Sequence, residues 1–227
     1  MSLPPSVPFT AFESQAKRLR ERRGAKVAMT VRVCGVDFEV MPGVYATSVD
    51  TELMADSVRL ESDEDFLEIG CGSGAVSLLL ARRCRGGMAT DINPQAILNS
   101  RLNSERLGVS TVQFVLGHVY AGIERSFDAI VCNPPYNNRP AQDEIDRMFW
   151  DPDDVLKREV FAGARQRLRD GGRLYLGWAD FSDLDHALPL DLAKRYGFVL
   201  NGEFERPSHS GRCRFEVFEF LATSLCI

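Results

Sequence analysis

The sequence predicts an α/β protein with a doubly wound, mostly parallel sheet, and three observations support this class. From residue 65 onward, short apolar runs alternate with segments of helical periodicity roughly ten to fifteen residues long. A glycine-rich turn follows the first apolar run, where a strand would pass into a helix. The 227 residues are 44% hydrophobic and 26% charged, which suits one full domain with a small attachment.

The N-terminal part of the chain predicts a small α+β cap in front of the sheet. Phe12 and Leu19 lie on one face of a predicted helix. The stretch 27–40 alternates β-branched and smaller residues around a Cys-Gly pair, which is typical of a short hairpin. We therefore expect residues 1–60 to form the cap and residues 61–227 to form the main domain.

Seven strands are predicted, each a short run rich in apolar or β-branched residues. They span residues 65–69, 86–92, 111–116, 127–132, 173–178, 198–200 and 214–221, and the helices between them span 75–83, 94–108, 155–168 and 184–196. The helix at 94–108 has the clearest boundaries, because Asn93 suits an N-cap, Pro94 the first helical position and Gly108 the end. Such alternation implies right-handed crossovers, with ligands bound beyond the carboxyl ends of the strands.

The charge balance argues against a protein that holds nucleic acid by bulk charge. The 27 Lys and Arg against 32 Asp and Glu give a net charge of −5, so we expect no DNA partner. Residues 1–26 are the exception, with six basic and two acidic side chains, or +4. This segment indicates either a solvated helix face or a docking site for an acidic partner or RNA.

The cysteines, histidines and apolar runs predict a cytoplasmic protein without a metal site. None of the six cysteines forms a CxxC pair, and they sit in or beside apolar runs, so reduced core cysteines are expected. The three histidines are scattered, so no metal is expected. The N-terminus lacks a signal-peptide pattern, and no apolar run approaches about 18 residues, so neither secretion nor membrane spanning is expected.

The segment LEIGCGSG carries the first functional signal. Gly70, Gly72 and Gly74 follow a strand and open a helix, where glycines let the backbone bend and approach a ligand closely. The spacing G-x-G-x-G departs from the dinucleotide pattern and lacks the Lys-Ser/Thr of a phosphate loop. Asp91 ends the next strand, where a carboxylate can accept both hydroxyls of a ribose. A nucleoside ligand without a required pyrophosphate fits best, the alternative for Asp91 being an acid that starts the next helix.

The segment NPPY, residues 133–136, carries the second signal. Two prolines fix the backbone and donate no hydrogen bond, so the turn is rigid and presents carbonyl acceptors. The Asn133 side chain adds an acceptor and Tyr136 a flat ring, a combination that suits an NH₂ on an sp² carbon. The alternative is a tight turn without chemistry.

Together, these motifs resemble class I S-adenosylmethionine-dependent methyltransferases, which have a Rossmann-like seven-stranded sheet. The NPPY segment resembles the branch that methylates amino groups of adenine or guanine, or the glutamine amide of release factors. The stretch MPGVYATSVDTELMADSV resembles the segment before the first strand of HemK-type release factor glutamine methyltransferases. The resemblance covers about residues 40–136.

The resemblance implies a site for S-adenosylmethionine. Its glycine loop would cradle the methionine part, with Glu68 near the amino group, Asp91 on the ribose and Ile92 on the adenine. The implied cofactor residues are Tyr45, Thr51, Glu68, Gly70, Cys71, Gly72, Gly74, Asp91, Ile92, His118, Val119 and Asn133. The family commonly has Gly-Asp where this chain has Gly117-His118, so His118 either accepts the adenine amine or only fills the loop.

The catalytic residues that the resemblance implies are Asn133, Pro134, Pro135 and Tyr136. We expect the Asn133 side chain and the Pro134 carbonyl to bind both hydrogens of a planar amino group and to expose its nitrogen lone pair. Tyr136 would stack on the acceptor. Phe149, Trp150 and Trp178 are candidates to line the pocket.

Three acceptors agree with these motifs. A glutamine of a protein such as a release factor is favoured by the HemK-type segment and a pI of about 5.3. A base amine in rRNA or tRNA is favoured by the basic N-terminus, and a small-molecule amine fits the short cap. An inactive, cofactor-binding partner subunit is the alternative outside enzymes. A companion subunit and homodimer formation are left open.

Overall fold

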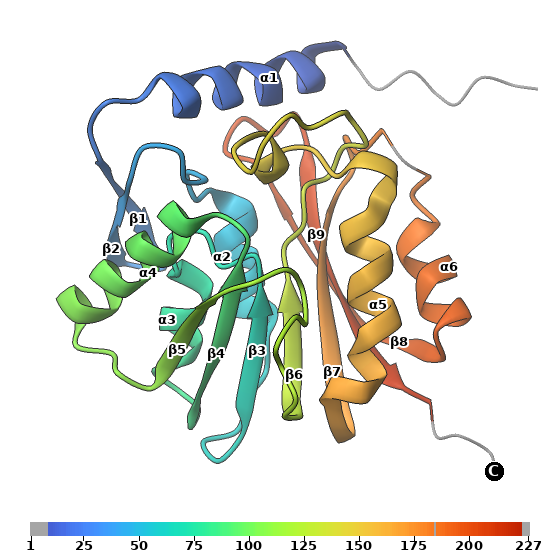
Figure 1. The fold of residues 1–227 in the computed structure, drawn as a ribbon. Coiled ribbons are helices and arrows are strands. Elements are labelled where there is room, and N and C mark those ends of the chain that lie inside the picture. Colours follow the sequence, from blue (N-terminus) through green and yellow to red (C-terminus); the bar gives the residue numbers. More distant parts are fainter. Residues whose placement is uncertain (1–8, 184, 224–227) are drawn as a thin grey trace, which may run out of the picture.

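The computed structural model describes residues 9–183 and 185–223, and side chains from residue 13 on. Its centre is a seven-stranded sheet in the order β5-β4-β3-β6-β7-β9-β8, in which β3 to β7 are parallel and β9 is antiparallel to both neighbours (Figure 1). The strands are β3 (Asp65–Ile69), β4 (Gly86–Asp91), β5 (Val112–Leu116), β6 (Phe127–Cys132), β7 (Leu168–Ala179), β8 (Phe198–Pro207) and β9 (Arg214–Ala222). The predicted fold class is therefore confirmed.

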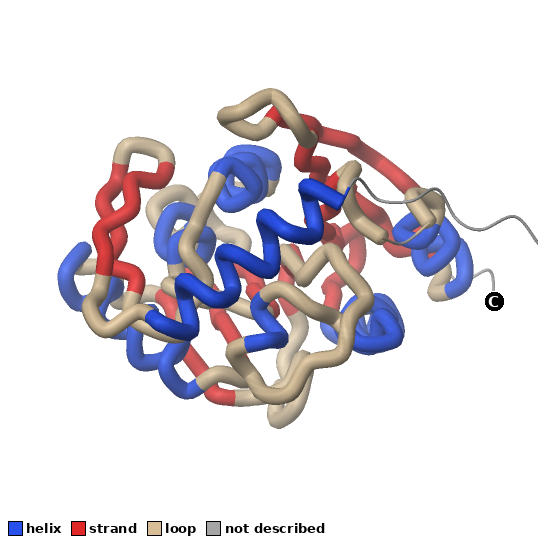
Figure 2. The backbone as a smooth tube through the Cα atoms, turned by 90° about the horizontal axis from the view of Figure 1, so that it is seen from above, coloured by secondary structure: helices blue, strands red, loops and turns tan. Residues whose placement is uncertain are grey.

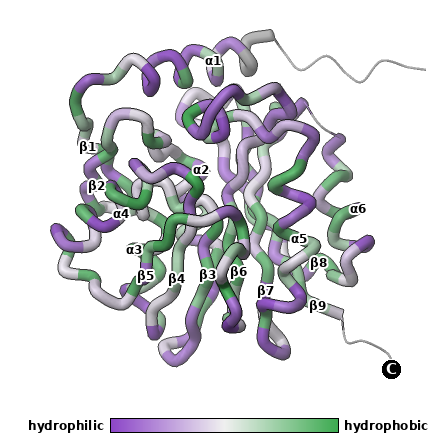
Figure 3. Tube along the Cα trace, in the orientation of Figure 1, coloured by the Kyte–Doolittle hydropathy of each residue, from purple (hydrophilic) through white to green (hydrophobic). Residues whose placement is uncertain are grey.

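Helices cover both faces of this sheet (Figure 1). They are α2 (Val49–Ser57), α3 (Ala75–Leu80), α4 (Pro94–Leu107), α5 (Val155–Arg167) and α6 (Leu188–Arg195), with short 3₁₀ turns η1 (Asp146–Met148) and η2 (Pro152–Asp154). Because strand side chains alternate, Phe66 of β3 joins a core with α2 and α3, whereas its neighbour Leu67 joins a core with α5 and α6. The hydrophobic stretches accordingly follow the central strands (Figure 3).

The N-terminal elements lie across one end of the sheet. The helix α1 (Phe9–Gly24) runs over the carboxyl ends of the parallel strands, as the view from above shows (Figure 2). The hairpin of β1 (Met29–Val33) and β2 (Val36–Val40) turns at Cys34 and Gly35, whose positive φ values of 47° and 78° suit a tight turn. Asn99 of α4 holds the hairpin by accepting from the Met41 N–H at 2.8 Å.

Several predicted boundaries differ from the structure. β7 begins at Leu168 instead of residue 173, because Arg169 binds Asp65 and Asp128 and so draws this segment against the sheet. β8 extends to Pro207, well past the predicted 198–200, because it pairs with β9 along its whole length. Its outer residues are largely polar, as on many edge strands, and so gave no apolar signal. α3 ends at Leu80, and α6 begins at Leu188 instead of residue 184, which lies outside the described residues.

Two expectations about side chains need correction. Cys34 is exposed in the hairpin turn and is no core cysteine, whereas Cys71 and Cys132 are buried as predicted; Cys226 lies outside the described residues. The basic face of α1 is not simply solvated, because Arg22 is buried and donates to the carbonyls of Val44 and Met41. In the described part of the chain, no helix is long and apolar enough to cross a bilayer.

Candidate active site

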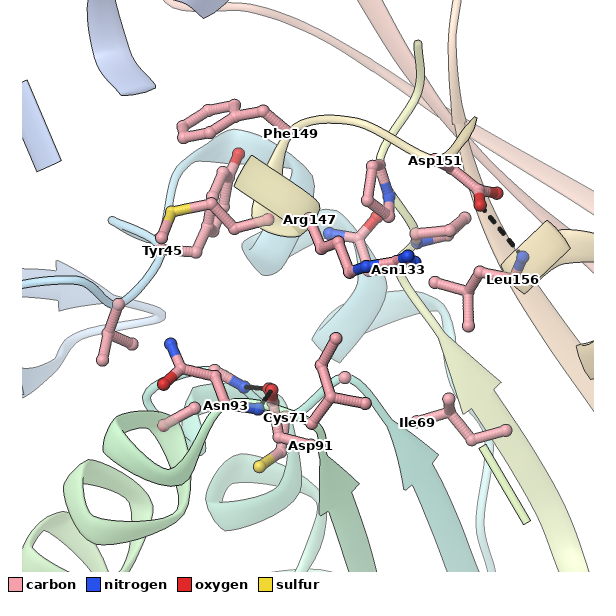
Figure 4. A pocket seen from close by; sticks show the side chains of 18 of the residues that line it. Tyr45, Ile69, Cys71, Asp91, Asn93, Asn133, Arg147, Phe149, Asp151 and Leu156 are labelled. Atoms are coloured by element: carbon pink, nitrogen blue, oxygen red, sulfur yellow. Dashed lines mark hydrogen bonds between the residues drawn. The ribbon is translucent and has the colours of Figure 1, made fainter. Parts of the chain in front are cut away.

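A cavity opens at the carboxyl ends of β3, β4 and β6, beneath α1 and the segment that carries η1 (Figure 4). The glycine loop lies on one side of it and the NPPY turn on the other. This is the position that the strand order predicts, since β3 lies between β4 and β6.

Short backbone hydrogen bonds fix the glycine loop. The N–H groups of Gly70 and Cys71 both donate to the Thr90 carbonyl, at 2.8 and 3.0 Å. Gly70 and Gly72 have φ values of +81° and +54°, and a Cβ at either would meet no protein atom within 4 Å, so the space beside them is open. Gly74 differs, because a Cβ there would stand 3.0 Å from the Ser100 Cβ; it packs the loop on α4 and does not line the cavity.

Asp91 connects the glycine loop to the start of α4. One carboxylate oxygen accepts from the Gly72 N–H and the other from the Asn93 N–H, both at 2.9 Å. Burial raises the pKa of Asp91, while these backbone donors lower it. A carboxylate has about four lone-pair positions, so acceptor capacity remains for a ligand beyond these backbone donors. Asp91 can therefore order the loop and still receive hydroxyl groups.

Glu68 is the most strongly perturbed acid that lines the cavity. It accepts hydrogen bonds from the N–H and hydroxyl of Ser77 at the start of α3. Burial raises the pKa of Glu68 to about 8, more than the two Ser77 bonds lower it. A cation placed beside this carboxyl would favour its ionised form.

Asn133 belongs to a polar network that includes Asp50, a residue the sequence analysis did not single out. The Asn133 Nδ2 donates to Asp50 Oδ2 across 2.9 Å, and the Tyr136 hydroxyl lies 2.7 Å from Asn133 Oδ1. The hydroxyls of Tyr136 and Tyr45 each lie 3.2 Å from Asp50 Oδ2. Burial, followed by the Asp50 charge, raises the pKa of both phenols, so they remain neutral donors. Asp50 Oδ1 is buried without a partner.

The local sequence explains where Asp50 lies. It occupies the first turn of α2, where a carboxylate is stabilised by the helix N-terminus. Ser48 caps this helix, and its N–H lies 3.4 Å from Thr51 Oγ1. The sequence did contain a signal for this helix start, an acidic residue two positions after a capping Ser. Nothing in it showed that Asp50 meets Asn133, 83 positions away.

Known proteins support a family assignment. The family model described as "Methyltransferase small domain" matches residues 35–199. The chain belongs to this family. The class I methyltransferase resemblance drawn from the glycine loop and NPPY is thereby confirmed.

Several curated proteins align with this member of the methyltransferase small domain family. It is 32% identical over 161 residues to the release factor glutamine methyltransferase of Bacteroides thetaiotaomicron, covering 63% of this chain and 58% of that one. The enzyme of the same name from Cereibacter sphaeroides is 31% identical over 159 residues, 63% of this chain and 56% of that one. The chain thus spans less than two thirds of these relatives. The Klebsiella pneumoniae ribosomal RNA large subunit methyltransferase G is 33% identical over 49% of this chain and 29% of that one.

Solved structures share the fold of the family member described here. The Thermus thermophilus 16S rRNA N2 G1207 methyltransferase, in complex with AdoMet and guanosine, superposes with a TM-score of 0.63 at 22% identity, covering 87% of this chain and 50% of that one. The ribosomal protein L11 methylase of Lactobacillus delbrueckii gives a TM-score of 0.59 at 15% identity, with 82% and 84% covered.

The cavity of this methyltransferase domain brings together nearly all predicted site residues. Those that line it are Tyr45, Thr51, Glu68, Gly70, Cys71, Gly72, Asp91, Ile92, His118, Val119, Asn133, Pro134, Pro135 and Tyr136. Phe149 and Trp150 line it too, as predicted, but Trp178 is fully buried and donates to His186 Nδ1 at 3.2 Å. Core packing therefore explains Trp178.

Two predicted residues have surroundings that the sequence did not indicate. The Tyr136 ring is largely buried, with its centroid 5.6 Å from that of Phe181, although one part of it reaches the cavity. His118 is exposed, and its Nε2 lies 2.6 Å from Glu159 Oε2. Stacking by Tyr136 and an adenine contact by His118 both stay predictions.

Proposed function

We propose that the protein transfers a methyl group from S-adenosylmethionine to a planar nitrogen, and that its acceptor is the glutamine side chain of a protein such as a translation release factor. The observation that carries this proposal is the network of Asn133, Asp50 and Tyr136, which lies across the cavity from the glycine loop and Asp91. This network presents oxygen acceptors, the chemistry that an amide NH₂ requires.

The residues of the cavity fit the cofactor. The open space beside Gly70 and Gly72 admits a methionine chain, and the free lone pairs of Asp91 suit ribose hydroxyls. Glu68 would face the amino group, Ile92 and His118 the adenine, and Tyr45 and Thr51 would close over it. When bound, the cofactor supplies an electrophilic methyl group on a sulfonium.

Asn133 and Pro134 would bind and orient the acceptor nitrogen. Asn133 Oδ1 keeps one lone pair beyond its Tyr136 contact, and among the described residues no backbone N–H of a turn or loop donates to the Pro134 carbonyl. Two acceptors on the two N–H hydrogens hold the nitrogen with its lone pair exposed. These bonds strengthen as positive charge develops on nitrogen, so they stabilise the transition state more than the ground state.

Asp50 would have two effects in this arrangement. By accepting from Asn133 Nδ2, it fixes which end of the amide faces the acceptor. Its buried negative charge also favours positive charge on the acceptor nitrogen. The methylated nitrogen becomes acidic and then releases a proton, which the Asp50 carboxylate of this network would accept.

A protein acceptor is better supported than RNA. The arginines that gave α1 its basic character bind within the chain: Arg18 lies over the Tyr45 ring, Arg22 is buried, and Arg23 pairs with Asp143 and Asp146. Few are left to bind phosphates. The release factor enzymes named above align with this chain, and two of them over 63% of its length. In this proposal residues 1–60 form the cap that closes the site and residues 61–227 the catalytic domain.

One labelling experiment tests the proposed function. The purified protein is incubated with methyl-labelled S-adenosylmethionine and a lysate separated into protein, RNA and small-molecule fractions, and in parallel with a purified release factor. We expect label in protein, on a glutamine side chain identified by peptide mass spectrometry. Label confined to RNA or to small molecules would contradict a protein acceptor, and cofactor binding without any product would favour the inactive partner subunit.

A further inference from the structure

Arg147 is the only lysine or arginine among the described residues that line the cavity. It lies in η1, and its side chain extends from there into the cavity, on the same side as Asn133 (Figure 4). Within the described part of the chain, its guanidinium has no hydrogen bond and no ion pair within 4 Å. A positive group in this position is therefore available to a ligand.

Three of the neighbouring acids are held by other cations, and the fourth, Glu144, lines the cavity without forming an ion pair with Arg147 within 4 Å. Asp143 and Asp146, on the same segment, both bind Arg23 of α1, at 2.8 and 2.7 Å. Asp151 is buried in an ion pair with Lys157 at 3.0 Å. Asp143 and Asp146 therefore fix the η1 segment to α1.

Packing also holds this segment in place. Phe149 and Trp150, which follow η1, pack against Leu19 of α1. Arg18 lies over the Phe149 ring, with its guanidinium carbon 5.8 Å from the centroid. Since two sets of contacts with α1 hold the segment around η1, the exposed Arg147 side chain is kept at the cavity.

The other charged side chains that line the cavity are acids. They are Asp50, Glu68, Asp91, Glu144 and Asp151, of which Asp151 is paired with Lys157 and Glu68 ionises only as its raised pKa is lowered by a cation. These acids match the sulfonium and the amino group that S-adenosylmethionine carries, but they repel its carboxylate. A carboxylate in such surroundings requires a cation, and an arginine binds it through a pair of parallel N–H donors.

We propose that Arg147 binds the carboxylate of the methionine part of S-adenosylmethionine. This inference rests on the proposed function only in assuming the cofactor, and not on the identity of the acceptor. Arg147 then determines cofactor specificity, because the protein selects ligands that carry the carboxylate. The contacts of Arg23 in α1 with the η1 segment contribute to cofactor binding by holding Arg147 in place.

The test compares two cofactors that differ only in this group. Binding of S-adenosylmethionine and of decarboxylated S-adenosylmethionine is measured by titration calorimetry for the unmodified protein, Arg147→Gln and Arg147→Lys. Arg20→Gln is the matched control, because Arg20 is exposed on α1 and does not line the cavity. Thermal unfolding of each variant confirms that it folds.

We expect Arg147→Gln to weaken S-adenosylmethionine binding about tenfold and to change binding of the decarboxylated form by less than about twofold. Arg147→Lys retains part of the affinity, and the difference between the two cofactors shrinks in high salt because the group is exposed. The inference would be overturned if the affinity of Arg147→Gln for S-adenosylmethionine stayed within about twofold of that of the unmodified protein. It would also be overturned if the variant lost affinity for both cofactors equally. An unmodified protein that binds neither cofactor would overturn the proposed function itself.

Discussion

The Asn133 side-chain amide donates to Asp50 Oδ2 across 2.9 Å, and this bond joins the NPPY turn to the first turn of α2. Because Asp50 accepts from Nδ2, the amide orientation is fixed and Asn133 Oδ1 is the acceptor of the Tyr136 hydroxyl at 2.7 Å. The polar network at the NPPY turn is therefore built from two distant parts of the chain.

Replacement of Asp50 by Asn removes the negative charge while keeping the size of the side chain. We expect kcat to fall about 10- to 100-fold and cofactor affinity to change little, because the charge acts on the acceptor nitrogen. Steady-state kinetics and calorimetry measure the two quantities. Asp56→Asn, on the exposed side of α2, is the control and keeps its activity. Turnover of Asp50→Asn within about threefold of the unmodified protein would count against the role of the charge.

Gly177 of β7 provides the space that Asn133 occupies. A Cβ at this glycine would stand 2.2 Å from Asn133 Oδ1 and 3.3 Å from its Cα, so Gly177→Ala forces the side chain to move. We expect a loss of at least about 100-fold in kcat, because a displaced acceptor no longer aligns the nitrogen. Gly24→Ala, which meets no atom within 4 Å, is the matched control. Full activity in Gly177→Ala would show that the position of Asn133 is not critical.

Glu68 predicts a pH dependence of cofactor binding. Its pKa of about 8 means that the carboxyl is protonated at neutral pH in the free protein. A bound ammonium group lowers this pKa, so binding releases a proton and affinity rises as the pH increases toward about 8. Calorimetry in buffers of different ionisation enthalpy measures the released proton, and Glu68→Gln abolishes the release. Proton uptake on binding would contradict this account.

The buried ion pair of Lys157 and Asp151 predicts a stability effect. Both side chains are almost fully buried, 3.0 Å apart, and Asp151 also accepts the N–H of Leu156. Lys157→Met leaves an unpaired buried carboxylate, so we expect the free energy of unfolding to fall by about 3 kcal/mol. Arg158→Met, on the exposed side of the same helix, changes it by less than about 0.5 kcal/mol. Urea denaturation measures both, and equal effects of the two variants would refute the prediction.

Local signals account for the parts of the fold that were predicted well. Asn93, Pro94 and Gly108 bound α4 within one residue of the predicted range, and β6 matches residues 127–132, since buried parallel strands are continuous apolar runs. The polar outer half of β8 carried no such signal. Its pairing with β9 is a tertiary contact that the sequence pattern does not show.

The site was predicted where single motifs define it and missed where distant segments meet. The glycine loop and NPPY turn are contiguous, so their residues line the cavity as predicted. Asp50 comes from the first turn of α2 and Arg147 from the 3₁₀ turn η1, and only tertiary packing brings them to the same cavity as Asn133. For the same reason, the sequence did not show that Arg22 and Arg23 bind partners within the chain, the Val44 carbonyl and Asp143 respectively.

The Asn133→Ala variant tests the central claim most directly. Its turnover on the identified acceptor and its affinity for S-adenosylmethionine are measured side by side with the unmodified protein. We predict that most of the rate is lost while the dissociation constant for the cofactor stays within about twofold, since Asn133 holds the acceptor nitrogen. A variant that keeps more than about a third of the turnover, less than one kcal/mol of barrier, would contradict the account.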